Sequence, residues 1–341
     1  MPTFVASAST QTPRLVRRWA SGNSVLTPLA VMDGQILFSG DKTLGRIDPE
    51  FATPLWNVPH HLSSQAVYRP RAAGQLVIAG GQQELGAWQL ADGKPRWLHQ
   101  ALTQVGTPFV TPQHTYVGDG HELLALNNTN GAIDWRFAST PDTLASYAPT
   151  VASETVFFGP GNGLLYALNK ADGTLKWQLD DSKEWQYTRQ LYVAGKVLVA
   201  GTYTELLYGI SIDTGKILWK FKVGNFINSH HVSGDTAYLW SPTGWVYAID
   251  VDTGKVRWRH QTTRYGNSAA NWGPMMAEIV TFEHRVYCLD MNQVLHVLDV
   301  TDGKELLRIP FAHDMRPSVS PLSGSRAVLA SDSGEIQLVQ W

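Results

Sequence analysis

YAIDVDTGKVRW, at residues 247–258, reads as an apolar strand, a tight turn and a second strand that ends in tryptophan. Its Thr-Gly pair supplies the positive φ that a tight turn requires. The same arrangement recurs about every 40 residues, with glycine four residues before the closing position: Gly93/Trp97, Gly131/Trp135, Gly173/Trp177, Gly215/Trp219, Gly254/Trp258 and Gly303/Leu307. A degenerate copy ends at Trp56. Such a unit is too small to bury its own apolar face and must stack on its neighbours.

A period of about 40 residues with four short strands per unit is typical of a β-propeller blade. The two ends of the chain complement each other, because residues 316–341 hold three strands without an outer one and residues 12–19 read as an outer strand with no blade before it. The sequence therefore predicts an all-β fold in a single domain, residues 1–341: an eight-bladed β-propeller of four-stranded antiparallel blades. Residues 20–315 would form blades 1–7, residues 316–341 the inner three strands of blade 8, and residues 12–19 the N-terminal strand that closes it.

The repeated tryptophans are predicted to be structural. An indole ring buries about 150–250 Å², and one at the same place in each blade would wedge between adjacent sheets near the turn glycine of a neighbour. This interpretation covers Trp19, Trp56, Trp97, Trp135, Trp177, Trp219 and Trp258.

The composition narrows the classes of partner. The chain carries 27 Lys and Arg against 29 Asp and Glu and has no dense basic stripe, so no nucleic-acid partner is expected. No apolar run is long enough for a membrane span. The single Cys288 excludes an internal disulfide and a cysteine metal cage. The N-terminal stretch lacks the features of a secretory signal, which predicts a cytoplasmic protein, or a periplasmic one if a signal peptide has been removed. We also expect a monomer.

Two repeats, Ala248–Trp258 and Ala167–Trp177, lie close to the pattern Ala-x-Asp-x-x-Thr-Gly-x-x-x-Trp. The repeat resembles that of the PQQ-like (quinoprotein-type) β-propellers over nearly the whole chain, and the size resembles the small BamB-like members. The resemblance implies the fold and a binding or scaffold role. Dehydrogenases of that family hold their cofactor beside a vicinal disulfide, with calcium and an aspartate base. With one cysteine and no long insertions, this chain is expected to bind no cofactor.

Polar and aromatic residues gather in one set of links. In a four-stranded blade, the link from the outer strand to the next inner strand and the link from the second to the third strand emerge on the same side, which we call the loop-rich face. The ligand-binding residues predicted there are Arg69, Trp185, Arg189, His231, Arg264, Asn271, Trp272, His313 and Arg316. Such a set of side chains suits an anionic, cyclic ligand such as an acidic sugar, in which arginine would pair with the carboxylate and aromatic side chains would stack on the sugar.

Three functions are consistent with these residues. The leading hypothesis is a binding or scaffold propeller that uses its loop-rich face for a protein or glycan partner. The alternative is a lyase on an acidic sugar, in which a tyrosine or histidine removes the proton beside the carboxylate; the candidates are Tyr68, Tyr187, His230 and Tyr265. A PQQ-dependent oxidoreductase is the second alternative. No metal site is expected, because adjacent His230 and His231 would point to opposite faces of a strand.

Overall fold

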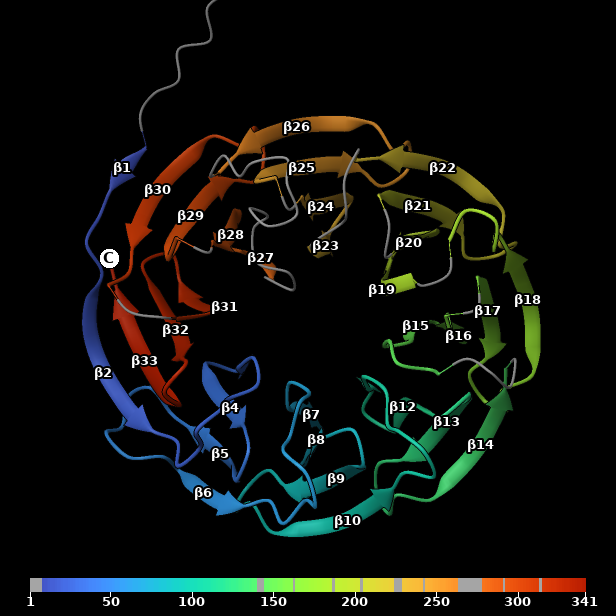
Figure 1. Ribbon diagram of the computed structural model, residues 1–341, viewed down its shortest axis with the longest axis horizontal. Coiled ribbons are helices and arrows are strands. Elements are labelled where there is room, and N and C mark those ends of the chain that lie inside the picture. Colours follow the sequence, from blue (N-terminus) through green and yellow to red (C-terminus); the bar gives the residue numbers. More distant parts are fainter. Residues whose placement is uncertain are drawn as a thin grey trace, which may run out of the picture.

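A computed structural model of the chain describes residues 8–139, 144–161, 163–185, 188–202, 205–223, 229–241, 243–262, 278–290, 292–312 and 315–341, with only the backbone of residue 189. Figure 1 shows eight sheets arranged as a ring around a central axis. Within the described ranges every regular element is a strand. The structure therefore confirms the predicted eight-bladed propeller.

Blades 1 to 4 follow each other along the chain, each from its inner to its outer strand. Blade 1 holds β3 (Ala30–Met32), β4 (Gln35–Ser39), β5 (Thr43–Ile47) and β6 (Trp56–Pro59). Blade 2 holds β7 (Arg71–Ala73), β8 (Leu76–Gly80), β9 (Glu84–Gln89) and β10 (Pro95–Gln100). Blade 3 holds β11 (Phe109–Val110), β12 (His114–Asp119), β13 (Glu122–Asn127) and β14 (Ile133–Ala138). Blade 4 holds β15 (Thr150–Ala152), β16 (Thr155–Phe158), β17 (Leu164–Asn169) and β18 (Leu175–Asp180).

Blades 5 to 8 complete the ring. Blade 5 holds β19 (Thr188–Ala194), β20 (Val197–Thr202), β21 (Leu206–Ser211) and β22 (Ile217–Lys222). Blade 6 holds β23 (Ser229–Ser233), β24 (Thr236–Trp240), β25 (Trp245–Asp250) and β26 (Val256–Gln261). Blade 7 holds β27 (Ile279–Phe282), β28 (Arg285–Leu289), β29 (Val294–Asp299) and β30 (Glu305–Pro310). Blade 8 holds β31 (Met315–Ser323), β32 (Arg326–Ser331), β33 (Glu335–Gln340) and the N-terminal β2 (Arg14–Ala20).

The N-terminal segment closes the ring. Strand β2 pairs antiparallel with β33, from Arg14 opposite Gln340 to Ala20 opposite Glu335, so the predicted closure of blade 8 is confirmed. A further strand, β1 (Ser9–Thr10), was not predicted. It runs parallel to β30, with Ser9 opposite Leu307, and covers the outer edge of blade 7.

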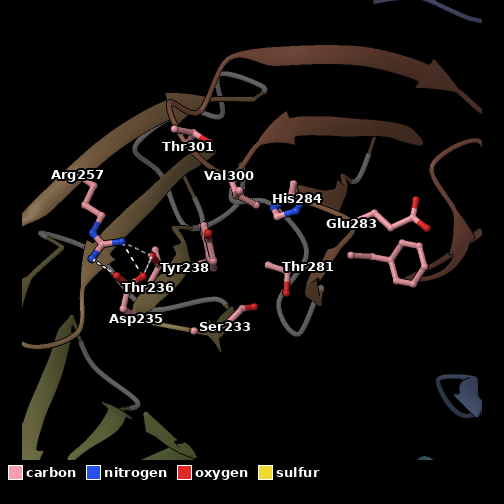
Figure 2. A pocket seen from close by; sticks show the side chains of 12 residues that line it. Ser233, Asp235, Thr236, Tyr238, Arg257, Thr281, Glu283, His284, Val300 and Thr301 are labelled. Atoms are coloured by element: carbon pink, nitrogen blue, oxygen red, sulfur yellow. Dashed lines mark hydrogen bonds and ion pairs between the residues drawn. The ribbon is translucent and has the colours of Figure 1, made fainter. Parts of the chain in front are cut away.

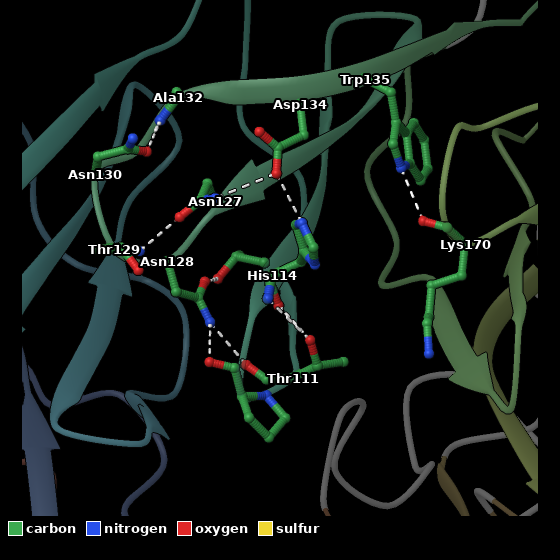
Figure 3. A network of polar contacts seen from close by, with 12 residues as sticks. Thr111, His114, Asn127, Asn128, Thr129, Asn130, Ala132, Asp134, Trp135 and Lys170 are labelled. Carbon is green, nitrogen blue, oxygen red and sulfur yellow. Dashed lines mark hydrogen bonds and ion pairs between the residues drawn. The ribbon is translucent and has the colours of Figure 1, made fainter.

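The repeated tryptophans join neighbouring blades, as predicted. Each of the seven donates its indole Nε1–H to a backbone carbonyl in the turn of the following blade; the acceptors are Phe51, Leu90, Asn128, Lys170, Ile212, Val251 and Val300. Figure 3 shows the bond of 2.9 Å from Trp135 in blade 3 to the carbonyl of Lys170 in blade 4. A buried indole needs a partner for its N–H. The repeat therefore supplies both an apolar wedge and a hydrogen bond at these junctions.

The turn glycines leave room for these rings. A β-carbon placed on Gly303 would sit 2.4 Å from Cε3 of Trp258, and the φ of this glycine is +70°. Real β-carbons do not approach a ring so closely, so alanine would force the indole or the turn to move. Gly234 offers a matched comparison: its φ is +59°, but nothing lies within 4 Å of a β-carbon there.

Gly303→Ala is expected to lower the free energy of unfolding by about 3 kcal/mol, because left-handed φ costs about 1–2 kcal/mol and overpacking costs about 1–3 kcal/mol. Gly234→Ala should cost only the φ penalty, about 1–2 kcal/mol. Urea denaturation followed by tryptophan fluorescence measures both variants. Equal losses of unfolding free energy in the two variants would show that the close contact between Gly303 and Trp258 adds nothing to the cost of the substitution.

The apolar core lies between blades. One buried cluster joins Trp240 and Val246 of blade 6 to Val286 and Cys288 of blade 7. Another joins Leu338 of blade 8 to Phe38 of blade 1, across the point where the ring closes. The described residues contain no helix with the length and apolar character needed to cross a membrane.

Candidate functional site

The inner strands of the blades surround the axis of the ring (Figure 1). The residues that meet there are Arg69, Arg71, Tyr192, His231, Glu278, Thr281 and Ser318, which we call the axial cluster. They come from blades 2, 5, 6, 7 and 8 or from the links that lead into them. Five blades thus converge on a site that no single repeat contains.

An ion pair crosses the axis. The Arg69 guanidinium, just before β7 of blade 2, donates through Nη2 to Oε2 of Glu278, just before β27 of blade 7. Ser318 of blade 8 donates its hydroxyl to the same carboxylate oxygen at 3.1 Å. The side chains of Arg69 and Glu278 are 22% and 27% exposed. Because both are largely screened from water, their attraction exceeds that of a pair on the open surface.

Tyr192 lies beside the two adjacent histidines of blade 6. Its ring meets those of His230 and His231 edge to face, with centroids 5.2 Å and 5.6 Å away. Burial, together with the charge of Glu278, raises the pKa of Tyr192 to about 12, so its hydroxyl stays protonated at neutral pH.

His230 and His231 differ in their burial and in their further contacts. His230 is buried against Gly201 of blade 5, where a β-carbon would sit 2.4 Å from its Cε1. His231 is half-buried and shares a hydrogen bond of 3.1 Å between its Nε2 and Oγ1 of Thr281 in blade 7. Burial lowers the pKa of His231, so its imidazole is neutral at neutral pH.

Arg71 leaves the axial cluster with excess positive charge. This side chain, the first of β7, is exposed, yet burial by the surrounding protein and the charge of Arg69 lower its pKa. Two guanidinium groups face one carboxylate, while Tyr192 and His231 are neutral. The described part of the cluster therefore carries one net positive charge.

Two of the predicted site residues, Arg69 and His231, belong to the axial cluster, and a third, His230, is buried beside it against the ring of Tyr192. Three others lie elsewhere. Tyr68 donates its hydroxyl to the carbonyl of Val105, and burial raises its pKa to about 12. Trp185 is 2% exposed and packs on Tyr208 in the core. Arg316 lies 3.9 Å from the carboxylate of Asp332.

The remaining predicted residues fall outside the part that the structure describes. These are Tyr187, Arg264, Tyr265, Asn271, Trp272 and His313, and the side chain of Arg189. Among the described residues, no group of three or more His, Cys, Asp or Glu side chains could hold a metal ion.

Sequence reasoning missed Arg71, Tyr192, Glu278, Thr281 and Ser318. All lie on an inner strand or at its start, whereas our candidates were read from the links between strands. A signal was present for two of them, because Arg71 and Glu278 are charged residues at the start of strands that line the axis. A charged side chain that is screened from water usually has a partner, and Glu278 finds its partner in Arg69 of blade 2.

A groove lies between blades 6 and 7 on the face opposite the loop-rich face, and its arginine is already bonded to carboxylates of the protein. It has a volume of ≈ 610 Å³ and is lined by Asp235, Tyr238, Arg257, Thr281 and His284, among others (Figure 2). Arg257 donates to both oxygens of Asp235, at 2.8 and 2.9 Å, and to Asp250 at 2.6 Å. These bonds lower the pKa of Asp235 to about 2. The Arg257 and Asp235 charges in the groove therefore pair with each other, and we do not assign the groove a ligand.

Comparisons with known proteins place the chain among β-propellers. It matches the family model described as outer membrane protein assembly factor BamB, over residues 40–188, 103–219 and 181–338. Its fold is similar to that of BamB from Moraxella catarrhalis, with a TM-score of 0.73 and 16% identity over 97% of this chain and 98% of that one.

Two other solved structures share the fold. The Saccharomyces cerevisiae protein Sqt1 gives a TM-score of 0.76 and 11% identity over 97% of this chain and 100% of that one. The C-terminal WD40 domain of Sif2 gives a TM-score of 0.76 and 14% identity over 98% and 99%. At these identities the likeness shows the fold alone. No curated protein sequence matches the chain.

Proposed function

The chain belongs to the family described as outer membrane protein assembly factor BamB, and from this premise we propose that it is a scaffold that binds a protein partner through its loop-rich face. The observation that carries the proposal is a pair of exposed leucines on that face. Leu102, in the link between β10 and β11, is 81% exposed, and Leu144, in the link between β14 and β15, is 47% exposed.

The links that carry the two leucines are both hydrogen-bonded to the end of β12 in blade 3. The backbone N–H of Leu102 donates to the carboxylate of Asp119 at 3.0 Å, and that of Thr103 donates to the same group at 3.2 Å. Ala145, next to Leu144, donates its N–H to the carbonyl of Gly120 at 2.6 Å. Apolar side chains presented to water on anchored loops favour a partner surface.

The contacts of the described residues favour binding over the lyase alternative. A tyrosine base must lose its proton, but the raised pKa of Tyr68 and its bond to Val105 oppose this. Arg69, proposed to neutralise a substrate carboxylate, already pairs with Glu278. A glycan partner remains the alternative ligand for the loop-rich face, and an array of acidic and neutral glycans tests it. The family description favours the periplasm over the cytoplasm, and cell fractionation distinguishes the two.

Replacing both leucines with serine should abolish recovery of the partner. Burying each leucine is worth about 1.5–3 kcal/mol, so crosslinked partner should fall by at least about tenfold with Leu102→Ser/Leu144→Ser. The matched control is Leu175→Ser, because Leu175 is 49% exposed on the outer strand β18. Crosslinking in cells, followed by mass spectrometry of the purified chain, measures all three. Unchanged recovery with the double variant, or rapid turnover of an acidic polysaccharide by the pure protein, would contradict the proposal.

A further inference from the structure

The junction between blades 7 and 8 lacks the contact that the repeat makes at the other junctions. There, a tryptophan of one blade donates its indole N–H to a carbonyl in the next blade, but blade 7 carries Leu307 at that position. Blade 8 also lacks the hairpin turn that would receive an indole, because its outer strand β2 comes from the N-terminal segment and not from a hairpin with β33. A different side chain is therefore needed to pack at this junction.

Trp341 holds the position in blade 8 that the acceptor residues hold in the other blades. It directly follows β33, as Val300 directly follows β29. The backbone N–H of Trp341 donates at 3.0 Å to the carbonyl of Ser325, just before β32, and that of Val300 donates at 3.2 Å to the carbonyl of His284, just before β28. The same position after the third strand is held in other blades by Leu90, Asn128, Lys170, Ile212 and Val251. Trp341 is thus the counterpart of these residues in blade 8.

The large and the small side chain change places at the junction between blades 7 and 8. Between blades 6 and 7, the large Trp258 packs in one apolar cluster with the smaller Val300. Other junctions combine a tryptophan with an aliphatic side chain in the same way: Trp56 with Leu90, Trp177 with Ile212 and Trp219 with Val251. In the cluster between blades 7 and 8, the smaller side chain is Leu307 and the large one is Trp341. Each of these junctions therefore holds one indole ring and one aliphatic side chain.

Trp341 packs at its junction without the hydrogen bond that the repeated tryptophans make. Its Nε1 is buried and has no hydrogen-bond partner among the described residues. We infer that Trp341 is an apolar strap that closes the ring between blades 7 and 8, where its indole takes the place of the tryptophan that blade 7 lacks. Strand β1 lies at the same place, with Ser9 opposite Leu307. The inference does not depend on the partner surface proposed above.

Exchanging the two side chains tests the inference. Leu307→Trp alone should lower the melting temperature, because it adds a second indole beside Trp341, and Trp341→Val alone should lower it by leaving a cavity. Leu307→Trp/Trp341→Val recreates the arrangement of Trp258 and Val300. This double variant should melt at least about 3 °C above the temperature expected from adding the two losses.

Losses that simply add in the double variant would overturn the inference. If Leu307→Trp alone does not fold, the expected result is that the double variant does fold, and its failure to fold would overturn the inference equally. Leu307→Trp/Trp245→Val is the control, because Trp245 lies in β25 of blade 6, with its ring 4.8 Å from Cζ of Arg259 and outside the cluster. The losses of this control should add, and a recovery as large as that of the exchange would also overturn the inference.

Phenylalanine at the same position separates the ring from its N–H group. Trp341→Phe keeps an aromatic ring in the junction and gives up an N–H that has no partner among the described residues. Trp258→Phe gives up the hydrogen bond of 2.8 Å to the carbonyl of Val300. The melting temperature should therefore fall less for Trp341→Phe than for Trp258→Phe. An equal or larger fall for Trp341→Phe would contradict a strap that acts by apolar packing alone.

Discussion

Deletion of residues 1–20 is expected to abolish the soluble, folded propeller. The deletion removes β2, whose residues pair with β33 from Gln340 to Glu335. It also removes Trp19, which is 2% exposed and packs with Phe38 and Leu338 where blade 8 meets blade 1. The loss of one buried tryptophan alone costs about 3–5 kcal/mol, a large share of the stability of a typical protein. The unpaired edge of β33 would then be open to other chains.

A shorter deletion separates closure from a general effect of shortening the chain. Of the described residues, removing residues 1–11 takes away β1, whose two paired residues lie against Leu307 and Arg308, and the backbone hydrogen bond from Gln11 to the carbonyl of Arg308. This should cost about 1 kcal/mol, because few backbone hydrogen bonds are lost. The soluble fraction, the elution volume on size exclusion and the melting temperature should all change strongly for the longer deletion and slightly for the shorter one. Similar behaviour of the two would mean that β2 does not hold the ring closed.

The repeat made the fold predictable because each unit carries the glycine and the tryptophan that join it to the blades on either side. Gly254 and Trp258 lie in one hairpin, but Gly254 receives Trp219 of the blade before, and Trp258 reaches Gly303 of the blade after. The spacing of these residues therefore specifies local turns and neighbour contacts together. Strand β1 escaped prediction because two residues paired to a blade edge leave no periodic pattern.

The axial cluster was predictable only in part. Arg69 and Glu278 are 209 positions apart and meet only because the ring closes, so no local pattern announces their ion pair. Trp185 was predicted to contact a ligand because it lies in a link of the loop-rich face, but its indole donates to the carbonyl of Gly163 and packs on Tyr208. A residue outside the repeat pattern can thus pack in the core as readily as it can bind a ligand.

A buried histidine in blade 7 is the second feature that should dominate stability. His296 is 2% exposed and lies between two carboxylates: its Nδ1 is 2.6 Å from Oε1 of Glu305, and its Nε2 is 3.2 Å from Oδ2 of Asp290. A ring that donates from both nitrogens is protonated. Burial alone would lower its pKa, but the hydrogen bonds to Asp290 and Glu305 outweigh burial, so the pKa of His296 is raised. Arg308 also pairs with Glu305, at 2.7 Å.

The raised pKa sets the sign of the pH dependence. A histidine with a higher pKa in the folded state contributes stability that is fully present below its unfolded pKa of about 6.5 and is lost as pH rises through the folded value. The pKa of Glu305 is lowered, because its bonds to His296 and Arg308 outweigh burial. Its contribution is therefore present above the unfolded pKa of about 4.5 and is lost as pH falls through the lowered value. Both contributions are complete between these two limits, near pH 5 to 6.

His296→Leu should lower the free energy of unfolding by about 3–5 kcal/mol near pH 6, because it leaves Asp290 and Glu305 buried without their shared cation. The difference between the unaltered chain and the variant should shrink as pH rises above 6.5, by at most about 1.4 kcal/mol per pH unit for one proton. His121→Leu is the control, because His121 is exposed and should leave the profile unchanged. Urea denaturation at a series of pH values gives these differences. If the free energies of unfolding of the unaltered chain and His296→Leu differed by the same amount at every pH, protonation of His296 would not contribute to the stability of blade 7.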